Sequence, residues 1–310
     1  MNYTEFSDYI KKCFRELMGN DVRINIITII GNNDCEREAL IILEKDNTMS
    51  PSIYLKEYYE DYVNGVPMGE IIACIYGVYK RYRIQNDINA DFFYNYEKIK
   101  KSIVYKLVNK EKNKKMLQDI PHYDVLDLSV VFYFIINTES VQNATAMINN
   151  EHLKMWNVSR DEIFKIAEEN TPRLLAYDIK SIDEILKKHF EQCRGFDEYI
   201  SDNGAMHMEK LSLSQTDVKM FVLTNIFQMN GAACMLYEKP VRWFSEKINS
   251  DIYIIPSSIH EVIMLPVNDI GKDELNVMVE QVNREELAEC DILSDHVYLY
   301  DRKKDTIIIP

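Results

Sequence analysis

Apolar positions recur with helical spacing in several parts of the chain. Between Thr4 and Met18 they fall three or four residues apart, which places them on one face of a helix. Gly19-Asn20 follows, and glycine or asparagine commonly ends a helix. The same spacing predicts further helices over 56–63, 68–83, 159–170, 241–248 and 273–287.

Other apolar runs are too short and too rich in β-branched residues for helices. Ile24–Ile30 and Ala39–Leu43 flank Gly31–Asp34, a composition typical of a β-hairpin. The near-continuous apolar run over 124–136 predicts one core strand covered on both faces, with 140–147 pairing beside it. Shorter runs predict strands near the C-terminus, over 220–223, 252–255, 262–265, 297–300 and 306–309.

Together these patterns predict an α+β protein with two mixed lobes. We expect the C-terminal lobe to hold a largely antiparallel sheet with flanking helices. Charge suggests where the lobes divide. Residues 1–120 carry 18 Lys/Arg and 18 Asp/Glu, whereas the whole excess of −14 falls after residue 120. We therefore expect lobes at 1–120 and 121–310.

One short pattern occurs twice in the second lobe. Val158–Ile163 and Ile270–Leu275 each follow a strand-like run, and each begins a predicted helix with an Asp-Glu pair. A duplicated strand–strand–helix unit explains the repeat. Chance also explains it, because the helix dipole favours acidic residues in any first turn.

Residues 80–115 form a basic aromatic segment. It holds eleven Lys/Arg against four Asp/Glu, interleaved with Tyr and Phe. This composition fits an anion-binding face with stacking rings, for which the candidates are Arg81, Arg83, Lys98 and Lys101. It also fits a solvated helix face whose aromatic rings point inward. The net charge of −14 argues against general nucleic-acid binding, which depends on neutralising phosphates.

The densest polar cluster consists of Ser257, Ser258, His260 and Glu261, between two predicted strands. In an extended strand Ser258 and His260 share one face but lie roughly 6–7 Å apart. A hydrolase would need a bulge at Pro256 and a carboxylate from elsewhere to bring them together. A strand break, in which the serine hydroxyls bind exposed backbone groups, is the structural interpretation. A ligand or peptide site is the third.

Cofactor signatures are absent from the sequence. It has no Walker loop and no Gly-x-Gly-x-x-Gly pattern, and its histidines do not fall at zinc-ligand spacing. We therefore expect no metal and no cofactor. Six scattered cysteines without a Cys-x-x-Cys pair suggest free thiols, and neither a signal peptide nor a membrane-length apolar run is visible. We expect a cytoplasmic protein that does not bind membranes.

Four stretches resemble a known family. They are Leu126–Tyr133, the segment from Trp156 to Leu174, Asn230–Tyr237 and Asp251–Glu261, the last containing Pro-Ser-Ser-Ile-His-Glu. They resemble the bacterial family catalogued as domain of unknown function 5688. This resemblance implies an intracellular bacterial protein without an established activity, and it carries over no catalytic residue.

These observations favour a non-enzymatic binding or interaction protein whose partner is a protein or a small molecule. The binding surface would be either the surroundings of Ser258 and His260 or the basic aromatic segment. The alternative is a hydrolase-like enzyme that uses Ser257 or Ser258 with His260 and Glu261. A serine hydroxyl within hydrogen-bond reach of the His260 ring, backed by a carboxylate in a cleft, would favour the enzyme.

Overall fold

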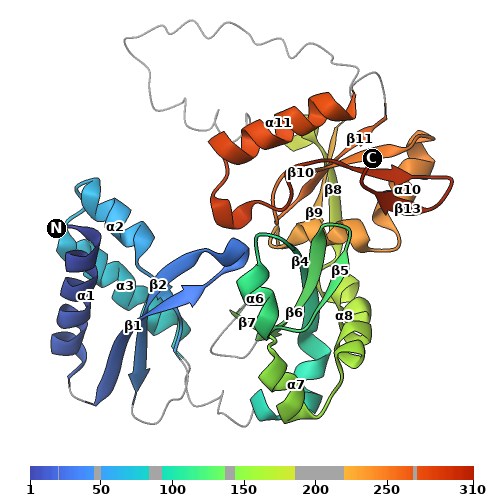
Figure 1. Cartoon of the computed structure of the whole chain (residues 1–310). Coiled ribbons are helices and arrows are strands. Elements are labelled where there is room, and N and C mark those ends of the chain that lie inside the picture. The colour runs from blue at the N-terminus through green and yellow to red at the C-terminus, as the bar shows by residue number, and fades with distance from the viewer. Residues whose placement is uncertain (20, 45–49, 84–92, 137–143, 186–219, 268–270) are drawn as a thin grey trace, which may run out of the picture. The chain divides into compact units, whose positions relative to one another are not determined.

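The computed structural model describes residues 1–19, 21–44, 50–83, 93–136, 144–185, 220–267 and 271–310 (Figure 1). The chain divides into two compact units. Unit 1 consists of Met1–Tyr105, Lys110–Tyr123 and Val131–Asn170, and unit 2 consists of Lys106–Asn109, Asp124–Val130 and Thr171–Pro310. The predicted lobes at 1–120 and 121–310 stay a prediction.

Unit 1 begins with helices on a small antiparallel sheet. The strands, in the order β1–β2–β3, are β1 (Val22–Ile30), β2 (Glu36–Glu44) and β3 (Ile53–Tyr54). The helices are α1 (Tyr3–Met18), α2 (Lys56–Val63) and α3 (Met68–Tyr82). Their apolar faces meet one face of the sheet in a shared core that includes Phe6, Ile10, Phe14, Ile24, Leu40, Ile42, Ile71 and Ile75. The predicted hairpin and helices are confirmed.

A four-stranded sheet follows, and the chain passes between the two units within it. Its order is β4 (Ile103–Asn109), β6 (Leu128–Ile136) and β5 (His122–Val125), with β7 (Ala144–Met147) also paired to β6. All of β6 except Ile135 is buried, which confirms the predicted core strand and its pairing with the 140–147 region. Four helices accompany the sheet: α5 (Tyr96–Ile99), α6 (Lys114–Asp119), α7 (Asn150–Trp156) and α8 (Arg160–Leu174).

The prediction that 124–136 forms one strand is wrong. β5 ends at Val125, Leu126 adopts a left-handed conformation with φ of 58°, and β6 begins at Leu128. The turn directs the Asp127 carboxylate to three side-chain donors. A continuous strand would separate this half-buried carboxylate from its donors, and an unmade bond to a partly buried charged group is costly.

Unit 2 holds the six-stranded antiparallel sheet, in the order β13–β12–β10–β11–β9–β8. The strands are β8 (Tyr177–Ser181), β9 (Phe221–Asn225), β10 (Ile252–Pro256), β11 (Val262–Pro266), β12 (Tyr298–Asp301) and β13 (Thr306–Ile308). From α11 (Lys272–Glu285), Leu275 and Val279 pack with Leu265 and Val297. From α10 (Pro240–Ile248), the Phe244 ring meets Phe221 edge to face at 4.7 Å. The α+β class and the antiparallel C-terminal sheet with helices are confirmed.

One prediction stays open, and two fall partly outside the described residues. The segments Val158–Ile163 and Ile270–Leu275 both lead into helices, α8 and α11, but a duplication stays a prediction. Cys193 and residues 84–92 of the basic aromatic segment lie outside the described residues, whereas five other cysteines carry free thiols. No helix in the described part of the chain is long and apolar enough to cross a membrane.

Candidate functional site

Ser257–Glu261 is the loop of the β10–β11 hairpin, closed where Pro256 pairs with Val262. The Ser258 hydroxyl oxygen accepts the backbone N–H of His260 at 3.0 Å. The Ser258 N–H donates to the carbonyl of Glu261 at 3.2 Å, and the Ser257 hydroxyl donates to the Glu261 carboxylate at 3.4 Å. The structure thus brings the four predicted residues together, but their mutual bonds stabilise the turn itself.

The His260 ring faces other partners. Its Nδ1 accepts the backbone N–H of Asn230 at 3.2 Å, and its Nε2 lies 3.7 Å from a carboxylate oxygen of Asp291. Among the described residues, neither Ser257 nor Ser258 is hydrogen-bonded to the imidazole. An activated serine requires that bond. The imidazole therefore has a carboxylate on one side and a backbone amide, in place of a hydroxyl, on the other.

A second loop, Asn225–Gly231, lies against the first. The buried side chain of Asn225 accepts the backbone N–H of Phe227 at 2.9 Å and that of Met229 at 3.5 Å. Its amide nitrogen donates to the Met229 carbonyl at 2.7 Å. One side chain thus satisfies three backbone groups of the loop, which fixes the conformation of the segment between β9 and the 3-10 helix η4 (Gly231–Leu236).

Gly231 is required where the two loops meet. A Cβ atom there would lie 2.2 Å from the Thr224 hydroxyl, 2.5 Å from the His260 carbonyl and 2.7 Å from the Asn225 nitrogen. The Thr224 hydroxyl donates to the His260 carbonyl at 2.8 Å, and the Ala232 N–H donates to the Ile259 carbonyl at 3.2 Å. We call Asn225–Gly231 and Ser257–Glu261 the paired loops.

The apolar side chains of the Asn225–Gly231 loop point outward, whereas Ile259 in the other loop is buried. Ile226 is 58% exposed, Phe227 51% and Met229 56%. Single exposed apolar residues are ordinary, but three within four positions of a well-bonded loop form a local apolar surface. The sequence analysis missed this surface. Its signal is an Ile-Phe-x-Met run flanked by Asn225 and Asn230-Gly231, turn residues that do not suit the interior of a strand.

A separate polar cluster in unit 2 surrounds Asp127. The carboxylate accepts the Tyr298 hydroxyl at 2.8 Å, the His296 Nε2–H at 3.1 Å and the Ser294 hydroxyl at 3.2 Å. Burial raises the pKa of Asp127, but the bonds from His296 and Tyr298 outweigh it and leave this pKa below its usual value. The bond to Asp127 raises the pKa of His296 despite partial burial. The His296–Asp127 pair joins residues far apart in the sequence, and the spacing of the histidines gave no sign of it.

The basic aromatic segment is only partly described. Arg81, Lys98 and Lys101 are exposed, on α3, α5 and the following 3-10 turn. Arg83 pairs with Glu44 at 3.1 Å. Three further lysines face carboxylates in the pairs Lys100–Glu97, Lys114–Glu111 and Lys115–Glu36. Such pairing reduces the charge left for an anion, and the anion-binding face stays a prediction.

Within the described residues, no group of three or more His, Cys, Asp or Glu side chains is placed to hold a metal ion. Comparison with known proteins gives one match. The model of a family of unknown function (DUF5688) matches residues 3–302, nearly the whole chain, and the resemblance noted from the sequence is confirmed. No curated protein and no solved structure matches the chain.

Proposed function

The chain belongs to the DUF5688 family, and we propose that it is a protein-binding protein whose contact surface is the apolar side of the Asn225–Gly231 loop. The observation that carries the proposal is the exposure of Ile226, Phe227 and Met229 on a loop whose backbone is held by buried polar groups. Aromatic residues and methionine are enriched at the centres of protein interfaces, where a few such anchors supply most of the affinity.

The fixed backbone of the loop supports this role. Gln228 and Asn230 hold left-handed conformations with φ of 55° and 54°. For residues other than glycine such conformations cost about 1–3 kcal/mol and persist only where the surroundings hold them. Asn225 and His260 supply that support through bonds to the loop backbone. Binding then requires little further ordering, which removes a main opposing contribution to affinity.

The charge of the chain indicates the chemistry of the partner. The net charge is −14, and Glu261 and Asp291 lie beside His260 at the base of the loop. A complementary surface therefore has an apolar pocket surrounded by basic residues. A partner with an acidic rim would be repelled, since like charges across an interface oppose association.

The second candidate is a hydrolase that uses Ser257 or Ser258, His260 and Glu261. The observation in its favour is Asp291, which lies 3.7 Å from His260 and is placed as an orienting carboxylate would be. Catalysis would require the imidazole to release the Asn230 N–H and turn to a serine hydroxyl. The binding proposal requires no such rearrangement.

The proposal is tested by photo-cross-linking in the native cells. A photoreactive phenylalanine analogue at position 227 is compared with the same analogue at position 243, where Trp243 is also an exposed aromatic of unit 2. Each captured protein is then purified, and its Kd is measured for the wild type, Phe227→Ala and Trp243→Ala.

We expect a protein captured from position 227 alone, bound by the purified wild type. Its affinity should fall about thirtyfold with Phe227→Ala, the effect of removing a central anchor of about 2 kcal/mol. Trp243→Ala should leave the Kd unchanged. Equal capture at both positions, or a Kd that is insensitive to Phe227→Ala, would rule out the loop as the contact surface.

A further inference from the structure

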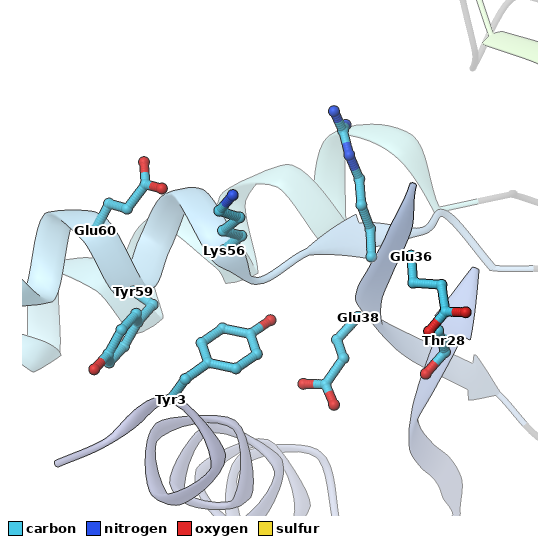
Figure 2. A pocket seen from close by; sticks show the side chains of 8 residues that line it. Tyr3, Thr28, Glu36, Glu38, Lys56, Tyr59 and Glu60 are labelled. Carbon is cyan, nitrogen blue, oxygen red and sulfur yellow. The ribbon is translucent and has the colours of Figure 1, made fainter. Parts of the chain in front are cut away.

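An open pocket of about 530 Å³ lies within unit 1, between α1, α2 and the β1–β2 hairpin (Figure 2). This volume falls within the range of roughly 300–1,000 Å³ that is usual for small-molecule sites. Its walls carry carboxylates, two basic side chains and two tyrosines. Such a lining suits a small charged ligand better than an apolar one, because a buried apolar ligand would leave these groups desolvated and unpaired.

The acidic side of the pocket is Glu38 on β2. Its carboxylate is half-buried and accepts the Ser7 hydroxyl at 3.2 Å, and no cationic side chain pairs with it among the described residues. Figure 2 shows the Tyr3 hydroxyl pointing toward this carboxylate. The Tyr3 and Tyr59 rings meet edge to face at 5.2 Å beside it. A carboxylate next to aromatic rings is a suitable site for an ammonium group.

Tyr3 keeps its proton under all ordinary conditions. Burial, followed by the negative charge of Glu38, raises the pKa of Tyr3 above its usual value. The hydroxyl therefore stays protonated and remains a hydrogen-bond donor. Tyr3 itself therefore adds no negative charge to that of Glu38.

The basic side of the pocket is Lys56, at the start of α2. Its ammonium group has no ion-pair partner in the part of the chain that the structure describes, not even Glu60 one turn further along the helix. Two other charged residues of the pocket, Arg37 and Glu36, have partners elsewhere, whereas Glu60 adds a further carboxylate beside Lys56. Arg37 stacks on Tyr54 at 5.4 Å, and Glu36 pairs with Lys115 at 3.6 Å. Lys56 is thus the base without an ion-pair partner among the described lining residues, and Glu38 is the acid that lies beside the tyrosine rings.

We infer that the unit 1 pocket binds a small zwitterion of the free amino acid class. Its ammonium group binds Glu38 and Tyr3, and its carboxylate binds Lys56. A ligand with one charge of each sign satisfies both groups, whereas a simple amine or a simple acid satisfies one and is repelled by the other. This site is independent of the paired loops, which belong to unit 2.

The test is titration of the full chain with each of the twenty standard amino acids. Binding is monitored by calorimetry and by changes in the amide NMR spectrum of the protein. Saturable binding of at least one of them is expected. N-acetylation of that amino acid, which removes its positive charge, should weaken binding at least tenfold, and conversion of its carboxylate to an amide should do the same. Glu38→Gln and Lys56→Met should each weaken binding of the unmodified amino acid by a similar factor.

The matched controls are Glu16→Gln and Lys12→Met, which remove an exposed acid–base pair on α1. They should leave the Kd unchanged, and thermal unfolding checks that every variant is folded. Absence of any binding tighter than about 10 mM would overturn the inference. So would binding that survives both Glu38→Gln and Lys56→Met, or a simple diamine that binds as tightly as the amino acid.

Discussion

In the paired loops of unit 2, the side chains of Asn225 and Ser258 are buried, whereas those of Ile226, Phe227 and Met229 face solvent. Asn225, Ser258 and His260 are occupied by backbone groups of the same loops, while Phe227 and its apolar neighbours have no such role. In the pocket of unit 1 the arrangement is reversed. There the apolar core lies between the helices and the sheet, and Glu38 and Lys56 line the pocket without an ion-pair partner among the described residues.

This difference separates two roles of polar residues. A side chain that binds buried backbone groups determines conformation, so its removal is felt in stability. A side chain without a protein partner contributes little to stability, so its removal is felt in ligand affinity. Substitutions in the paired loops should therefore change the free energy of unfolding, and substitutions in the pocket should leave it alone.

Gly231→Ala should have the largest effect. The added Cβ would overlap the Thr224 hydroxyl and the His260 carbonyl, and neither can move without loss of a hydrogen bond between the loops. We expect a loss of about 2–3 kcal/mol in the free energy of unfolding. Denaturant unfolding in a Trp156→Phe background measures it, since Trp243 is then the only tryptophan and reports on unit 2.

The matched control is Gly77→Ala in α3, where a Cβ meets nothing within 4 Å. Alanine in place of a helical glycine should stabilise unit 1 by about 0.5–1 kcal/mol, and this is followed through Trp156 in a Trp243→Phe background. If both substitutions stabilise the protein, the close approach of the paired loops does not exist.

Asp127→Asn should have the next largest effect, about 1–3 kcal/mol, because three donors lose a charged acceptor. The effect should depend on pH. The folded pKa of His296 is raised, so its contribution is complete below about 6.5 and is lost as pH rises through the raised value.

The folded pKa of Asp127 is lowered, so its contribution is complete above about 4 and is lost as pH falls through the lowered value. The difference in unfolding free energy between wild type and Asp127→Asn should thus be largest between pH about 4 and 6.5 and decline toward pH 8. Unfolding curves across this range measure it. A difference that grows from pH 6 to 8 would show that the His296–Asp127 bond is not formed.

His260→Ala should cost about 1 kcal/mol, since it leaves the Asn230 N–H without its acceptor. Ser257→Ala is the control, because the Ser257 hydroxyl makes only a 3.4 Å bond within its own loop. It should change the free energy of unfolding by less than about 0.5 kcal/mol. The hydrolase alternative predicts a different result. His260→Ala and Ser257→Ala would then both leave the free energy of unfolding unchanged, and both would lower a hydrolytic activity.

Lys56→Met and Glu38→Gln should have the smallest effect on stability, within about 0.5 kcal/mol of the wild type. Thermal unfolding of the two variants beside the wild type measures it. A large loss for Lys56→Met would mean that its ammonium group supports the fold and is not free for a ligand.

Local sequence signals predicted much of the fold. Helical periodicity identified α1, α3 and α11. At the start of α8 the Ser159 hydroxyl accepts the Glu162 N–H at 3.1 Å, as a local helix cap does. The near-continuous apolar run identified β6, which the structure shows buried on both faces. These features depend on residues close together in the sequence, which is why a single chain reveals them.

Contacts between distant segments could not be predicted. His260 is bonded to Asn230, and Asp127 to Tyr298, over separations that no spacing rule covers. The turn at Leu126 was missed because it lies inside an apolar run. The strand β8 was missed because Tyr177–Ser181 is an edge strand with polar positions and no apolar run. The sequence identified the polar cluster at Ser257–Glu261. That the exposed Phe227 lies on a neighbouring loop was shown only by the structure, in which the two loops are bonded together.

The central claim is that polar side chains hold the Asn225–Gly231 loop rigid while its apolar residues face water. Amide hydrogen exchange at Phe227 tests it directly, in the wild type and in Asn225→Ala. The Phe227 amide, bonded to the Asn225 side chain at 2.9 Å, should exchange at least tenfold more slowly than a free amide, and Asn225→Ala should abolish that protection. Exchange of the wild-type amide at the free rate would contradict the account.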